Sequence, residues 1–173
     1  MNHAAVRRMS PLTVLAVVSL VGVPPATAAP PTPVPSALFY DLPAGLGCAF
    51  HLQVSGTDAK THIQEFRDKN GNVIRTITAG DGYTLTYTNA DTGKSLAIQS
   101  SGSVQHTTLN PDGTSTVTLT GNNGLILFPT DHPAGPTTTQ YVGRVVFTTD
   151  QSGNATVVST SGKSTDICAA LAQ

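Results

Sequence analysis

The sequence predicts an all-β protein, an antiparallel meander of eight to ten strands closed as a barrel or folded as a curled sandwich, with a short C-terminal helix. Three observations support this prediction. Apolar and polar residues alternate with a period of two over many short stretches, and residues typical of tight turns separate these stretches. Only 11% of the residues are charged, while Thr, Ser and Gly are abundant. β-Branched Thr is well suited to the solvent face of a sheet, as in many exported β proteins.

The first 28 residues are typical of a cleavable secretory signal peptide. Arg7 and Arg8 precede an apolar stretch over 12–23, which is too short to cross a hydrocarbon core of ~30 Å as a helix. Small residues at 26–28 predict cleavage before Ala29. The alternative, an uncleaved membrane anchor, lacks both the length and a charged flank. We therefore expect a secreted or cell-envelope protein with no transmembrane segment once the signal is removed.

The remaining chain predicts one domain with a short leader. Residues 29–36 contain four prolines, which lack the NH group a sheet needs, so we expect a disordered, extended leader there. Residues 37–173 form a single β domain, long enough to bury roughly two thirds of the surface of its unfolded chain. This mature chain keeps all ten acidic residues and seven of the nine basic ones. It has no polybasic patch, which argues against nucleic acid as a partner.

Strands are predicted from the alternation. The apolar residues share one face of the predicted strands at 48–54, 83–88, 95–99 and 116–120. The predicted strands at 61–67 and 73–79 have a less clear division into an apolar and a polar face. Two further strands are predicted at 141–148 and 155–160. Residues 125–128 are apolar on both faces, so we expect cover on both sides.

The segments between these strands predict their connections. Asn70-Gly71 favours a type I′ hairpin, and the segments 91–93, 110–113 and 150–153 predict type I turns followed by a left-handed glycine. Residues 129–140 form a long Pro-rich loop, a kind of segment that often carries function.

The C-terminus and the cysteines predict a covalent link. A capping residue and strong helix formers over 164–172 predict a short helix with Ile167, Cys168 and Leu171 on one face. Cys48 and Cys168 are the two cysteines, and in an exported chain we expect them to form a disulfide. The alternatives are a lipid-modified Cys48, which lacks a lipobox after the apolar stretch, and a reactive thiol.

The histidines and acidic residues predict neither a metal site nor a cofactor. No histidines have the spacing of a zinc motif, although His51 and His62 could face each other across a hairpin. The segment 68–72 resembles the start of a calcium loop, but Val73 and Ala79 stand where that loop needs Gly and Glu.

We expect no enzyme activity, because no local constellation activates a nucleophile. There is no Gly-x-Ser-x-Gly elbow, Glu65 is the sole glutamate, and the absence of Trp removes a common platform for sugars. Asp131-His132 is the best local candidate for a catalytic pair, and turn chemistry is its simpler interpretation.

Several motifs resemble those of small secreted actinobacterial proteins of unassigned function. They are Leu42-Pro43-Ala44-Gly45 before Cys48, the segment 91–95, Gly143-Arg144-Val145-Val146-Phe147 and the closing segment 162–171. The resemblance implies export and supplies no catalytic residue, ligand or partner.

The function expected from the sequence is a non-enzymatic β-barrel protein that binds a small apolar ligand. Its site is predicted beneath the 129–140 loop, lined by Leu127, Phe128, Tyr141, Val145 and Phe147. The simpler interpretation is that these five side chains fill the core. The alternative function is a cell-envelope or extracellular interaction protein without a small-molecule ligand, which would contact its partner through Thr-rich faces and the long loop.

Overall fold

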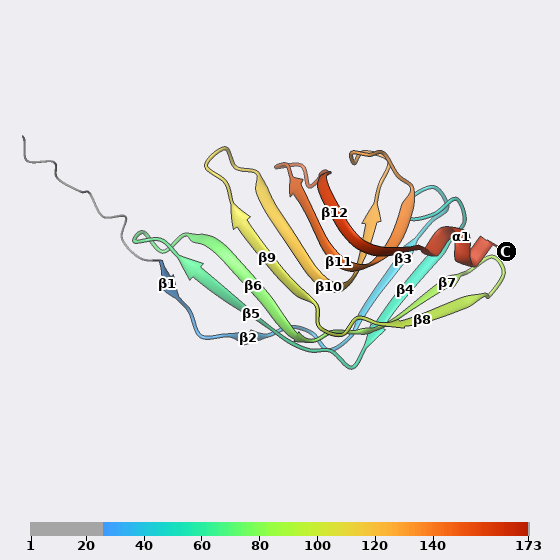
Figure 1. Cartoon of the computed structure of the whole chain (residues 1–173), viewed down its shortest axis with the longest axis horizontal. Coiled ribbons are helices and arrows are strands. Elements are labelled where there is room, and N and C mark those ends of the chain that lie inside the picture. Colours follow the sequence, from blue (N-terminus) through green and yellow to red (C-terminus); the bar gives the residue numbers. More distant parts are fainter. Residues whose placement is uncertain (1–25, 173) are drawn as a thin grey trace, which may run out of the picture.

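The computed structural model describes residues 26–172, which form two antiparallel sheets and one helix (Figure 1). Sheet A contains β1 (Thr27–Ala28), β2 (Thr32–Pro33), β5 (Lys60–Arg67), β6 (Val73–Asp81), β9 (Val104–Leu109), β10 (Ser115–Leu127), β11 (Thr137–Thr149) and β12 (Ala155–Asp166). Sheet B contains β3 (Leu38–Leu42), β4 (Leu52–Thr57), β7 (Thr84–Asn89) and β8 (Ser95–Gln99), and helix α1 (Ile167–Ala172) follows β12. The mainly antiparallel β fold and the terminal helix are confirmed. The predicted signal peptide lies almost wholly outside the described residues.

The strand order interrupts the expected meander. Sheet A has the order β1-β5-β6-β9-β10-β11-β12, with β2 also paired to β5, and sheet B has the order β3-β4-β7-β8. The predicted meander is present from β9 to β12, and elsewhere β4 pairs with β7 and β6 with β9. The chain crosses between the sheets after β2, β4, β6 and β8. Two of these crossing segments lie very close to each other. A Cβ on Gly82, which follows β6, would stand 1.7 Å from the carbonyl oxygen of Ser100, which follows β8.

The inner face of sheet B packs against α1. The predicted alternation is confirmed here: Leu52 and Val54 on β4, and Leu85 and Tyr87 on β7, are buried. They form one core cluster with Cys48, Ile167 and Leu171. The carboxylate of Asp166 caps the helix by accepting a hydrogen bond from the NH of Ala169 at 2.9 Å.

A row of glycines crosses the three long strands of sheet A. Gly121 on β10 lies opposite Gly143 on β11, which lies opposite Gly162 on β12. All three have positive φ, and a Cβ on any of them would approach a carbonyl oxygen within 2.0–2.3 Å. Only glycine fits such a position. The long strands curve strongly in Figure 1, and the row provides the backbone freedom for this curvature.

The row also explains why β10 continues through Gly121–Gly124, a turn-like sequence. Beyond it, Leu125 and Leu127 belong to a second core cluster with Val145, while Ile126 packs against the first cluster. The expected cover on both faces of this stretch is confirmed for these three residues. Phe128, in contrast, is 38% exposed.

The hairpin at 68–72 differs from its predicted turn type. Gly71 N donates to Asp68 O at 3.0 Å, which places Lys69 and Asn70 at the centre of the turn. Gly71 has a φ of 85°, whereas Asn70 does not have positive φ, so the predicted type I′ turn is wrong. The cause is the Asp68 carboxylate, which accepts the NH groups of Asn70 and Asn72. The glycines of the other three predicted turns, Gly93, Gly113 and Gly153, have the expected positive φ.

The Pro-rich leader lies along the outer edge of β5. Ala29 N, just before the first proline of the leader, donates to Glu65 O at 2.8 Å, and Val34 N, between Pro33 and Pro35, donates to Thr61 O at 2.9 Å. Pairing is feasible because the residues that are not proline supply the NH groups. These two bonds hold few of the leader's residues, and its mobility stays a prediction.

The disulfide between Cys48 and Cys168 is confirmed, with the Cα atoms 5.5 Å apart. It joins α1 to the segment that leads into β4. None of the helices in the described part is long and apolar enough to span a membrane.

Candidate functional site

A cavity of about 470 Å³ lies where the two sheets meet. Its volume is within the usual range for small-molecule sites. Sheet A and sheet B both supply walls, and Val34 of the leader contributes to the rim. The site is therefore built from segments that are far apart in the sequence.

The sheet A wall is a row of side chains across four strands. Ile63 on β5 lies opposite Thr78 on β6, then follow Gln105 on β9 and Leu119 on β10. Residues directly opposite each other in an antiparallel pair share a face. All four line the cavity, so the register of sheet A places them together.

Sheet B contributes Tyr40 and Tyr87 to the second wall, beside Val54 and Leu85, and Tyr83 joins them from the segment that leads into β7. Tyr87 is buried and donates its hydroxyl to Gln140 Oε1 at 2.8 Å. Burial raises the pKa of Tyr87 to about 12, so the phenol stays protonated at neutral pH. The hydroxyl of Tyr83 donates to Pro35 O at 2.7 Å and ties the leader to the rim of the cavity.

One fully buried hydroxyl in the wall has no partner among the described residues. Thr61 on β5 is only 7% exposed, and its Oγ1 makes no hydrogen bond with any described residue. The hydroxyls of Ser100 and Ser103, in contrast, both donate to Asn122 O. A buried hydroxyl without a partner costs free energy, so Thr61 Oγ1 is the polar group that a bound molecule would satisfy.

The residues that line the cavity carry no charged side chain, histidine or cysteine. The cavity thus offers apolar surface, aromatic rings, hydroxyls and amides. It is equipped to hold an uncharged molecule, because an ion placed there would lose hydration without a counter-charge.

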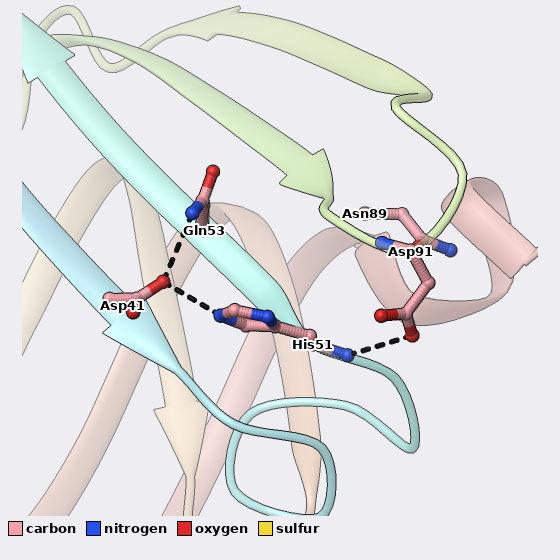
Figure 2. Close-up of polar contacts among 5 residues, drawn as sticks. All are labelled: Asp41, His51, Gln53, Asn89 and Asp91. Atoms are coloured by element: carbon pink, nitrogen blue, oxygen red, sulfur yellow. Dashed lines mark hydrogen bonds and ion pairs between the residues drawn. The ribbon is translucent and has the colours of Figure 1, made fainter.

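A second cluster surrounds His51 at the end of sheet B (Figure 2). Asp41 Oδ1 lies 2.7 Å from His51 Nε2 and accepts a hydrogen bond from Gln53 Nε2 at 3.1 Å. The hydrogen bonds from His51 and then Gln53 lower the pKa of Asp41. Asp91 accepts the backbone NH of His51 at 3.3 Å. This cluster is solvent-exposed, and its hydrogen bonds include no serine, threonine or cysteine that could act as a nucleophile.

The structure separates the two histidines that sequence reasoning brought together. His51 pairs with Asp41, whereas His62 on β5 lies opposite Ala79 and Pro33 in sheet A. The hypothesis that they face each other is wrong, because His51 immediately precedes β4 of sheet B whereas His62 lies in sheet A. Within residues 26–172, no group of three or more His, Cys, Asp or Glu residues is arranged to hold a metal ion.

Asp131 and His132 anchor the loop between β10 and β11, which ends before Thr137 and is therefore shorter than the predicted loop over 129–140, because Thr137 already pairs with Leu127. Asp131 is only 7% exposed, and its two carboxylate oxygens accept the NH groups of Ala155 and Phe128 at 2.7 and 2.6 Å. The backbone of His132 bonds to Ala155 and Val157 on β12. The Asp131 carboxylate therefore has a clear structural role in attaching the loop to β12.

The five residues predicted to line a ligand site lie near this loop. Leu127 and Val145 are buried in the second core cluster, Tyr141 and Phe147 pack against it, and Phe128 is partly exposed. None of the five lines the cavity between the sheets. A ligand site beneath the loop stays a prediction. Sequence reasoning did not find the cavity between the sheets, because its walls depend on pairings between distant strands.

Comparisons of the chain with protein-family models, with curated proteins and with solved structures found no match. The resemblance to small secreted actinobacterial proteins stays a prediction.

Proposed function

We propose that this protein is a secreted, non-enzymatic binding protein that holds a small apolar ligand in the cavity between its two sheets. The observation that carries the proposal is the uncharged, largely apolar lining of a cavity of about 470 Å³. Apolar surface with a few placed polar groups is the usual composition of a small-molecule site. The disulfide is compatible with an oxidising compartment.

The proposal includes a curled sandwich as the working architecture. The support for it is that both sheets line the same cavity, and that the chain crosses between them four times. In this arrangement the ligand would fill the space in which the side chains of the two inner faces do not contact each other.

The test is saturable binding of an uncharged fluorescent dye, followed by displacement with a panel of apolar molecules. Ile63→Trp places a large ring in the sheet A wall, and we expect it to weaken dye binding at least about tenfold by filling the space. Ile77→Trp is the matched control: Ile77 lies on the neighbouring strand, does not line the cavity, and its side chain points to the opposite face from that of Thr78.

Thermal unfolding of both variants checks that they remain folded. The proposal would be contradicted if the unmodified protein did not bind the dye, or if the two substitutions weakened dye binding equally. Absence of binding would instead favour the alternative role, an interaction protein of the cell envelope or extracellular space.

A further inference from the structure

We infer that the ligand of this cavity is a neutral molecule with one hydroxyl or carbonyl group on a largely apolar, ring-containing body, and that Thr61 Oγ1 bonds that group. The inference rests on the proposed function and specifies the chemistry of its ligand. Three features carry it: the unpartnered hydroxyl, the uncharged lining and the tyrosines.

The unpartnered hydroxyl gives the position of the polar contact. Thr61 lines the cavity and is nine-tenths buried, and its Oγ1 has no hydrogen-bond partner in the described part of the chain. Its backbone carbonyl already accepts the NH of Val34 at 2.9 Å. The side-chain oxygen is therefore the group left to serve a ligand, and a hydroxyl can either donate or accept.

The charge of the lining selects against ions. A carboxylate or ammonium bound beside Thr61 would meet no opposite charge among the lining residues, and burying an unpaired ion is far more costly than burying a neutral polar group. A fatty-acid anion is thus a poor occupant, whereas an alcohol, phenol or ketone of similar size suits the site.

The aromatic side chains indicate the shape of the apolar part. Three of the four tyrosines in the chain, Tyr40, Tyr83 and Tyr87, line this one cavity. Aromatic side chains offer offset-stacked and edge-to-face contacts to a ring. A ring-containing ligand uses such a wall better than a plain alkyl chain does.

The test compares naphthalene, 2-naphthol and 2-naphthoate at pH 7 by titration calorimetry with the full mature chain. These probes share a ring system and differ in one group: none, a neutral hydroxyl, or a charged carboxylate. We expect 2-naphthol to bind at least about tenfold more tightly than 2-naphthoate, and more tightly than naphthalene.

Thr61→Val isolates the hydroxyl, since valine has nearly the same shape. We expect it to weaken 2-naphthol binding about tenfold, to the level of naphthalene, and to leave naphthalene binding unchanged. Thr61→Ser, which keeps a hydroxyl, should restore the preference. Thr86→Val is the control, because Thr86 lies between Leu85 and Tyr87 on β7 but does not line the cavity. Thr61→Val should melt no lower than the unmodified protein, since it removes a buried polar group that has no partner.

The inference would be overturned, and the proposed function left intact, by either of two results. One is equal affinity for 2-naphthoate and 2-naphthol, and the other is a Thr61→Val variant that binds 2-naphthol as tightly as the unmodified protein does. Binding of the neutral dye but of none of the three probes would do the same. If neither the dye nor any probe binds, the proposed function fails as well.

Discussion

Three exposed aspartates at hairpin turns, Asp68, Asp112 and Asp150, stabilise their turns through hydrogen bonds to their carboxylates. Asn72, Thr114 and Asn154 each donate a side-chain and a backbone hydrogen bond to the aspartate of their own turn. These bonds, the side-chain ones first, lower the pKa values of the three carboxyl groups. Bonds to the charged form favour it over the protonated form, so the turns link folding to pH.

The sign of this linkage gives a prediction at the scale of single residues. The folded-state pKa values lie below the unfolded ones, so the stabilisation is present above about pH 4 and is lost as pH falls through the folded values. We expect the melting temperature to fall below pH 4, and to fall less steeply in the double variant Asp68→Asn/Asp150→Asn. Asparagine keeps one oxygen that accepts the backbone NH groups, loses the bond from the side-chain amide of Asn72 or Asn154, and does not titrate. The measurement is thermal unfolding from pH 6 to pH 2.5, with Asp81→Asn as the control. An unchanged slope in the double variant would rule out this role.

At the scale of elements, the glycine row determines how the long strands of sheet A are shaped. Gly121 and Gly153 have almost the same backbone conformation, with φ of 89° and 86°. They differ in the space around the Cα atom. A Cβ at Gly121 would lie 2.0 Å from the carbonyl oxygen of Gly102, whereas one at Gly153 would meet nothing within 4 Å. Gly121, in the glycine row, must therefore be glycine for both its conformation and the space available. Gly153, in a turn, must be glycine for its conformation alone.

Alanine substitutions test this difference. Gly153→Ala should cost about 1–2 kcal/mol, the usual cost of a left-handed conformation for an L-residue. Gly121→Ala should cost more, about 3–5 kcal/mol, because the backbone of β10 must also move away from Gly102. Urea unfolding of the two variants measures the free energies. Equal losses would show that the close approach at Gly121 has no energetic weight.

At the scale of the whole molecule, local patterns predicted the elements and failed for their long-range arrangement. The alternation at Leu52 and Val54 predicted a buried face, and the cysteine count predicted the disulfide, because each depends on local chemistry. The pairing of β4 with β7 could not be predicted, since hydrophobic periodicity does not specify which strand is the neighbour. The cavity depends on this pairing and on that of β6 with β9, so the cavity and the place of Thr61 in its wall were missed. One signal was present: Thr61 begins a strand of unclear polarity, which is typical of a face that is only partly covered.

The disulfide also acts on the whole molecule, because it closes most of the domain. Cys48 and Cys168 are 120 residues apart in sequence, and both lie in or against the core cluster that joins sheet B to α1. In the chain-entropy model, closing a loop of this length stabilises the folded state by about 5 kcal/mol. For a domain of this size, we expect the double variant Cys48→Ala/Cys168→Ala to melt about 10–20 °C lower than the oxidised protein.

Reducing the unmodified protein should lower its melting temperature by a similar amount, and the double variant should not respond to reductant. Mass spectrometry of the exported protein should find no free thiol. The cavity is lined by neither cysteine, so below the melting transition the double variant should bind the neutral dye as the oxidised protein does. A melting temperature that reductant leaves unchanged, or two free thiols in the exported protein, would contradict this account of the disulfide. Loss of dye binding from the folded double variant would show instead that the disulfide maintains the geometry of the site, because the core cluster around α1 includes Leu85 and Tyr87 of the cavity wall.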